Sequence, residues 1–165
     1  MPAPRSPARG PNSRMKPRLH EALRSSFHLS ARDPSLKVLI VEDQFAVLEA
    51  LRQILRSIDP QAEVTGLSTE RQATGWLEQH SKDWDLLLID LFLAEGHGFN
   101  VLRHCVSRTP SQRVALISNY VGEPVRERAL QAGADAFFDK TRDIDGLIDF
   151  CTAASRQARV RQTSA

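Results

Sequence analysis

Residues 36–43 read Leu-Lys-Val-Leu-Ile-Val-Glu-Asp, a short apolar run that is rich in β-branched residues and ends in two carboxylates. Its length and composition predict a strand that is buried on both faces. Apolar residues then recur at helical spacing from Val47 to Ile58, and this pattern ends before Pro60. A strand followed by an amphipathic helix is typical of the units that build a parallel sheet.

The same unit recurs along the rest of the chain. We expect further strands at 63–67, 85–90, 113–117 and 136–139. We expect further helices at 69–80, after Gly98, at 123–132 and from Ile144 onward. Ser68 is the expected cap of the helix at 69–80. Because the strands are continuous apolar runs, the pattern predicts an α/β fold, a doubly wound parallel sheet of five strands with five helices.

Composition excludes several classes of protein. The chain has 165 residues and a formal net charge of +2, and it is 41% hydrophobic and 25% charged, as in soluble globular proteins. No apolar run approaches the roughly 20 residues that span a bilayer, which argues against a membrane protein. The two cysteines lack CxxC spacing. We therefore expect core cysteines, a cytoplasmic location and no cysteine-built zinc site.

Charge divides the chain unevenly. Residues 1–35 hold seven basic and two acidic residues and six of the nine prolines. We expect a basic, Pro/Ser-rich disordered arm at 1–35, a folded domain at 36–158 and a polar tail at 159–165. The arm is either a tail without a specific role or an electrostatic tether to nucleic acid or acidic lipid. Its dispersed basic residues make sequence-specific DNA binding unexpected.

Polar residues follow four of the predicted strands where each strand ends. They are Glu42, Asp43, Asp90, Ser118 and Lys140. Ligands of such sheets bind at the carboxyl ends of the strands, so these side chains should converge. Clustered carboxylates repel one another, and Mg²⁺ is the hard dication that oxygen ligands prefer. With a lysine and a hydroxyl nearby, an aspartate could act as a nucleophile for a phosphoryl group.

Each of these residues also has a purely structural interpretation. Asp43 could cap the helix that begins at Phe45, and a single Asp, Ser or Lys at a strand end is a weak signal. Their joint arrangement in order along the chain favours a site. His97 has no second histidine at ligand spacing, so we expect it to be solvated.

Four motifs carry a resemblance to a known family. They are Val38-Leu39-Ile40-Val41-Glu42-Asp43-Gln44, Leu87-Leu88-Ile89-Asp90-Leu91, Ala115-Leu116-Ile117-Ser118 and Ala136-Phe137-Phe138-Asp139-Lys140. With these motifs, residues 36–158 resemble the stand-alone receiver domain of bacterial two-component response regulators. The resemblance implies a flavodoxin-like fold with strand order 2-1-3-4-5.

The resemblance also implies roles for individual residues. Asp90 would accept a phosphoryl group from a histidine kinase or a phosphotransfer protein. Mg²⁺ would be held by Glu42, Asp43, Asp90 and the backbone carbonyl of Phe92. Lys140 would pair with Asp90, while Ser118 and Phe137 would form the switch. A downstream protein would then read the face made by the helix at 123–132, the strand at 136–139 and the last helix.

The sequence departs from the family pattern at a few positions. Thr141 follows Lys140 where many members have proline, and Asn119 replaces a small residue. Phe92 and Tyr120 lie two residues beyond Asp90 and Ser118. We hypothesise that these rings slow autodephosphorylation, the alternative being that they are ordinary loop aromatics.

Three functions compete. The first is a phosphorylatable receiver that signals by contact with a protein, with no enzyme activity beyond Mg²⁺-dependent self-phosphorylation and autodephosphorylation. The second is a phosphate-independent receiver-like module for interaction or dimerisation, and the sequence does not decide whether a homodimer forms. The third is a small α/β enzyme or nucleotide binder, which the lack of a GxGxxG or GxxxxGK[ST] loop disfavours.

Overall fold

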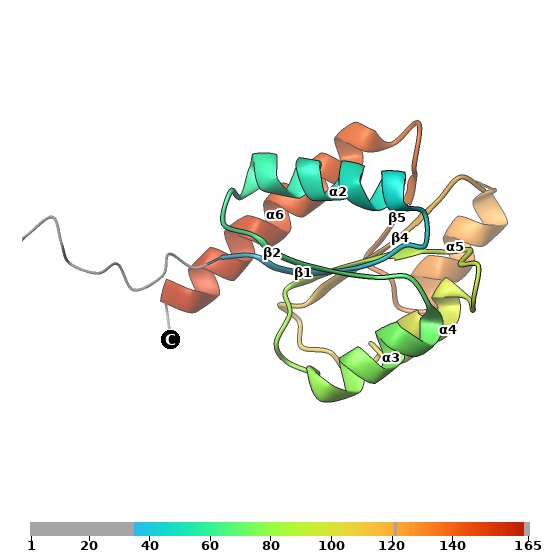
Figure 1. Cartoon of the computed structure of the whole chain (residues 1–165), viewed down its shortest axis with the longest axis horizontal. Coiled ribbons are helices and arrows are strands. Elements are labelled where there is room, and N and C mark those ends of the chain that lie inside the picture. Colours follow the sequence, from blue (N-terminus) through green and yellow to red (C-terminus); the bar gives the residue numbers. More distant parts are fainter. Residues whose placement is uncertain (1–34, 121, 164–165) are drawn as a thin grey trace, which may run out of the picture. The chain divides into compact units, whose positions relative to one another are not determined.

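The structure, a computed structural model, describes residues 35–120 and 122–163. The basic arm predicted at 1–35 therefore lies, apart from Ser35, outside the described residues. The five strands are β1 (Lys37–Val41), β2 (Glu63–Leu67), β3 (Leu86–Asp90), β4 (Arg113–Ser118) and β5 (Ala136–Asp139) (Figure 1). The helices are α2 (Phe45–Ile58), α3 (Glu70–Gln79), α4 (Gly98–Arg103), α5 (Glu123–Gln131) and α6 (Ile144–Thr163).

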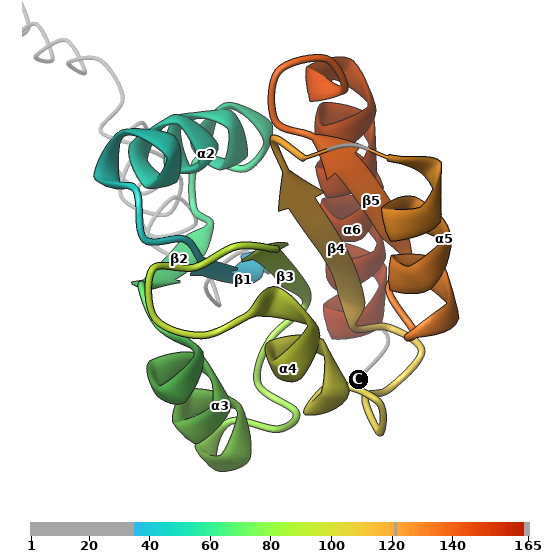
Figure 2. The ribbon, with the colours of Figure 1, turned by 90° about the vertical axis from the view of Figure 1, so that its right-hand side faces the viewer.

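The strands form one parallel sheet in the order β2-β1-β3-β4-β5, which confirms the predicted α/β fold and its 2-1-3-4-5 order. Helices α2 and α6 cover one face of the sheet, and α3, α4 and α5 cover the other (Figures 1 and 2). None of the helices within the described ranges is long and apolar enough to cross a membrane.

The central strands explain why the sheet is buried on both faces. Along β3, Leu87 and Ile89 pack against the layer of α3, α4 and α5, whereas Leu86 and Leu88 pack against α2 and α6. All four side chains are fully buried. Each such burial stabilises the fold by about 1.5–3 kcal/mol relative to exposure in water. A continuous apolar run is thus the pattern that a two-sided core requires.

The cysteines belong to this core, as predicted. Cys105 and Cys151 are both buried and not bonded to each other. Burial raises the pKa of each thiol to about 12, so neither forms a reactive thiolate near neutral pH.

The cap of α3 differs from the prediction. Thr69, not Ser68, is the N-cap, because its hydroxyl oxygen accepts a hydrogen bond from the Gln72 backbone N–H. Gln72 reaches back in turn, and its Oε1 accepts from the backbone N–H of Ser68 at 3.1 Å. This reciprocal pattern resembles a capping box shifted by one residue.

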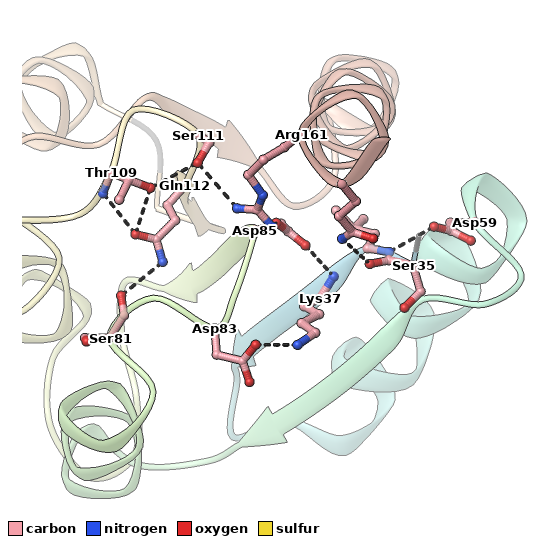
Figure 3. A network of polar contacts seen from close by, with 12 residues as sticks. Ser35, Lys37, Asp59, Ser81, Asp83, Asp85, Thr109, Ser111, Gln112 and Arg161 are labelled. Carbon is pink, nitrogen blue, oxygen red and sulfur yellow. Dashed lines mark hydrogen bonds and ion pairs between the residues drawn. The ribbon is translucent and has the colours of Figure 1, made fainter. Parts of the chain in front are cut away.

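The C-terminal boundary also differs. The polar tail predicted at 159–165 is helical as far as Thr163, so α6 carries the folded unit beyond residue 158. The reason is a pair of buried carboxylates at the amino-terminal edge of the sheet. Arg159 lies 3.5 Å from Asp59, and Arg161 forms an ion pair with Asp85 (Figure 3). Residues that look like a solvated tail in the sequence therefore have tertiary partners.

Candidate functional site

The carboxyl ends of four neighbouring strands meet at one edge of the sheet. Glu42 and Asp43 follow β1, and Asp90 and Ser118 are the last residues of β3 and β4. Lys140 follows β5, and its backbone N–H donates to the carbonyl of Ser118 at 3.0 Å. The parallel register aligns these ends, so the structure places all five residues that were predicted to converge at the same edge of the sheet.

Three carboxylates form the centre of this edge. Glu42, Asp43 and Asp90 each offer one oxygen, and these oxygens lie within 4.8 Å of one another. Glu42 is 1% exposed and Asp90 is 3% exposed. Lys140 Nζ lies 2.6 Å from Glu42 Oε2 and 3.0 Å from Asp90 Oδ2. The Lys140 ammonium thus pairs with two of the three carboxylates, which leaves the group with an excess of negative charge.

Each carboxylate oxygen of Glu42 and Asp90 has a hydrogen-bond or ion-pair partner. Glu42 Oε1 accepts from the Gln44 N–H at 3.0 Å, and its other oxygen accepts from Lys140. Asp90 Oδ2 faces Lys140, while its Oδ1 accepts, among the described residues, a single long bond of 3.3 Å from the Phe92 N–H. Oδ1 is therefore the less engaged oxygen of Asp90.

Asp43 is different. Its Oδ2 accepts from the Ala94 N–H at 3.2 Å, but its Oδ1 is buried and has no hydrogen-bond partner in the described parts of the chain. A buried carboxylate oxygen without a partner costs free energy, and a bound cation removes that cost. The donor set, all oxygen and all anionic, fits Mg²⁺.

The structural alternative for Asp43 is wrong. The N-cap of α2 is Gln44, whose side chain makes no capping hydrogen bond to a described residue. Asp43 instead turns toward Glu42 and Asp90, where it adds repulsion rather than a hydrogen bond to the helix.

Burial shifts the protonation equilibrium of Glu42 toward the neutral acid. Removal from water raises the pKa of this carboxyl, although the hydrogen bond from Lys140 lowers it again in part. Without a further cation, the site therefore favours the protonated form of Glu42 more than water does.

The predicted switch residues, Ser118 and Phe137, lie on the neighbouring strands β4 and β5. Ser118 is buried, and its Oγ accepts from the Tyr120 N–H at 2.9 Å, which leaves the hydroxyl proton free to donate. Phe137 is fully buried in the core beside α5. The guanidinium carbon of Arg126 lies 5.5 Å from the centre of the Phe137 ring.

Comparison with known sequences identifies the family. The response regulator receiver domain matches residues 38–152. The chain belongs to the response regulator receiver family. Two relatives of this receiver domain are the alginate biosynthesis transcriptional regulatory protein AlgB of Pseudomonas putida and the cyclic di-GMP phosphodiesterase response regulator RpfG of Xanthomonas campestris. The first is 31% identical over 136 residues, or 82% of this chain, and the second is 32% identical over 111 residues, or 66%.

This receiver domain corresponds to only part of those proteins, because the chain spans 29% of the length of each. Solved structures show the same fold. The receiver domain of a DNA-binding response regulator from Colwellia psychrerythraea has a TM-score of 0.64 at 21% identity, with 72% of this chain and 97% of that chain covered. The phosphorylated cyanobacterial phytochrome response regulator RcpA has a TM-score of 0.61 at 21% identity, with 72% and 90% covered.

Three exposed aromatic side chains follow the polar residues of the receiver site closely in the sequence. Phe45 is 75% exposed, Phe92 51% and Tyr120 73%. Each lies two residues beyond Asp43, Asp90 or Ser118, and the rings of Phe92 and Tyr120 are 5.8 Å apart, edge to face. Sequence reasoning identified Phe92 and Tyr120 but missed Phe45, although the common spacing could have revealed it.

His97, Glu70 and Gly98 hold the loop that follows Asp90 in place. The sequence did not reveal the roles of His97 and Glu70. His97, which was predicted to be solvated, is partly buried: it is the N-cap of α4, its Nδ1 accepts from the Phe99 N–H at 3.3 Å, and its ring stacks on Phe99. Glu70 Oε2 accepts from the His97 N–H at 2.8 Å, a role with no signal in the sequence. At Gly98, any Cβ would lie 2.4 Å from the Asp90 carbonyl oxygen, so only glycine fits.

Proposed function

We propose that this receiver domain works in the cytoplasm as a phosphorylatable signalling module. Asp90 accepts a phosphoryl group from a histidine kinase or a phosphotransfer protein, and the domain then signals to a protein partner by a conformational switch. One observation above all supports this function. Oxygens of three carboxylates meet within 4.8 Å, Lys140 pairs with two of these carboxylates, and Asp43 Oδ1 is buried without a partner among the described residues.

Glu42, Asp43 and Asp90 are the side chains that would hold Mg²⁺, together with the backbone carbonyl of Phe92. The ion would neutralise the oxygens of an incoming phosphoryl group, whose negative charge the carboxylates otherwise repel. The buried, unpartnered Asp43 Oδ1 gives this assignment a physical basis in this chain.

Asp90 would act as the nucleophile. Its Oδ1 has one long hydrogen bond within the part of the chain that the structure describes, so this oxygen is available to attack phosphorus. An O–P bond forms as the P–N bond of a phosphohistidine breaks, and the bond pair leaves with the imidazole nitrogen. Lys140 stays beside Oδ2 and balances the charge of the acyl phosphate.

Ser118 and Lys140 would report the new group to the rest of the fold. The Ser118 hydroxyl proton can donate to a phosphoryl oxygen, and the Ser118 carbonyl already accepts from the Lys140 N–H. A shift there would be passed to Phe137 and the face formed by α5, β5 and α6, where we propose that the downstream protein binds. Such a change is a shift of population between two packings.

The test is intact mass after incubation with acetyl phosphate and Mg²⁺. The wild-type chain gains one phosphoryl group, Asp90→Asn gains none, and the matched control Asp83→Asn, an exposed carboxylate at the opposite edge, gains one like the wild type. If the small donor fails, a phosphorylated phosphotransfer protein takes its place. A gain that persists in Asp90→Asn contradicts the assignment, and no gain from either donor favours the phosphate-independent interaction module.

A further inference from the structure

A groove of about 640 Å³ lies between α4 and α5, beside the loop that follows Asp90. Its volume is in the range of specific binding sites. Both helices cover the same face of the sheet (Figure 2). The groove shares α5 with the proposed output face but reaches away from β5 and α6, so it is a separate surface.

The floor of the groove is apolar. Phe99 and Leu91 form its buried part, and Pro124 and Val125 on α5 form the opposite wall. The half-exposed ring of Phe92 stands at one end. Large apolar side chains of a partner would find room and contact here.

The charged residues of the groove are all basic. Arg103 from α4 and Arg128 from α5 are exposed and line its two sides, and no acidic residue lines it in the parts of the chain that the structure describes. Neither arginine has a carboxylate within 4.0 Å among those residues, whereas Arg126 on the same helix is paired with Asp143. Glu123 and Glu127 of α5 do not line the groove.

We propose that this groove binds an acidic, apolar peptide segment of a partner protein. Carboxylates of the segment pair with Arg103 and Arg128, and its large apolar side chains pack on Val125 and on the exposed part of Phe92. Arginines beside aromatic and aliphatic pockets are the pattern of interface hot spots.

Single-stranded nucleic acid fits the groove less well. Base stacking needs a free aromatic face. The Phe99 ring lies parallel to the His97 ring at 5.5 Å, and the Arg128 guanidinium carbon lies 4.9 Å from its centre. Phe92 packs edge to face against His97 and Tyr120. The rings are thus engaged with one another rather than presented to bases.

The groove is also adjacent to the phosphoacceptor. Phe92 pairs with His97 through a backbone bridge and donates its N–H to Asp90 Oδ1. A segment bound here would sense the state of Asp90, and by reciprocity phosphorylation would change its affinity. This coupling rests on the proposed function, whereas the docking itself does not.

A random-peptide library displayed on phage, selected against the full unphosphorylated chain, tests the docking. We expect the enriched peptides to combine Asp or Glu with Leu or Phe. Synthesised and titrated by fluorescence polarisation, they should bind the double variant Arg103→Ala/Arg128→Ala about tenfold more weakly than wild type. Both arginines are exposed, so the fold should survive, which circular dichroism checks.

Arg142→Ala, an exposed arginine outside the groove, is the matched control and should leave binding unchanged. Failure to enrich acidic peptides, or equal binding to the double variant, overturns the proposal. Binding of oligothymidylate that requires both arginines overturns it in favour of nucleic acid. Since no phosphoryl group is present, these results do not depend on whether Asp90 is phosphorylated.

Discussion

Both edges of the sheet hold buried carboxylates, but they differ in how those charges are balanced. At the amino-terminal edge, Asp59 accepts from the Leu36 N–H at 3.0 Å and lies beside Arg159. Asp85 there accepts from the Lys37 N–H at 2.9 Å and pairs with Arg161 (Figure 3). Each buried carboxylate at this edge has a backbone donor and an arginine.

At the carboxyl-terminal edge, Lys140 pairs with two of three clustered carboxylates, and an oxygen of the third, Asp43, has no donor in the described residues. The comparison teaches that a buried acidic residue is not by itself a sign of function, because the chain can satisfy it. The sign is the charge that the chain leaves unbalanced. That charge must come from outside, and a dication is the simplest source.

The largest effect on stability should follow from removing the ammonium. Lys140→Met leaves Glu42 and Asp90 buried without their cation, so the free energy of unfolding should fall by about 3–5 kcal/mol. Urea unfolding monitored by circular dichroism measures this change. A loss below about 1 kcal/mol, the value of an exposed pair, would show that the ammonium is not needed to balance this edge.

A smaller loss is expected at the balanced edge. Asp85→Ala removes the acceptor of the Lys37 N–H and the partner of Arg161. We expect the free energy of unfolding to fall by about 2–3 kcal/mol, less than for Lys140→Met, because Arg161 remains partly exposed to water. The same unfolding experiment measures it, and a calorimetric Mg²⁺ titration should be unchanged. Altered Mg²⁺ affinity would mean that the two edges are not independent.

Unlike Lys140→Met and Asp85→Ala, Asp43→Asn should not lower the free energy of unfolding. Without Mg²⁺ this variant removes a charge that repels two others, so the free energy of unfolding should stay constant or rise by up to about 1 kcal/mol. Addition of Mg²⁺ should stabilise the wild type and not the variant. A clear loss of stability without the ion would mean that Asp43 has a structural role.

The smallest expected effect is the pH dependence of stability that Glu42 contributes. The folded pKa of Glu42 is raised by burial above its unfolded value, so its favourable contribution is present below the unfolded pKa and is lost as pH rises through the folded pKa. In Mg²⁺-free buffer, the stability of wild type relative to Glu42→Gln should therefore fall as pH rises above about 4.5, the ordinary pKa of this carboxyl. A difference that is constant or grows with pH contradicts this direction.

Much of the fold was predictable because its signals are local. The continuous apolar runs of β1, β3 and β4 are long enough to be identified one by one, and each carboxylate or hydroxyl follows its strand directly. Parallel order then brings the ends together. The convergence of Glu42, Asp90 and Lys140 can therefore be predicted from the strand positions and their parallel order alone.

The rest depends on contacts between distant segments. The helical conformation of 159–163 is tied to Asp59 and Asp85, which are far away in the sequence. The capping role of His97 depends on how its loop packs against Glu70. The unpartnered oxygen of Asp43 is visible only once all possible donors have positions. A sequence pattern shows which groups are present but not which remain unsatisfied.

The most direct test of the account is calorimetric titration of Mg²⁺ into the full chain near neutral pH. We predict one ion per wild-type chain, binding at least about tenfold weaker in Asp43→Asn, and wild-type binding in Asp83→Asn. Binding to Asp43→Asn with wild-type affinity, or no binding to the wild type, would contradict the claim that the unbalanced edge of the sheet is a metal site.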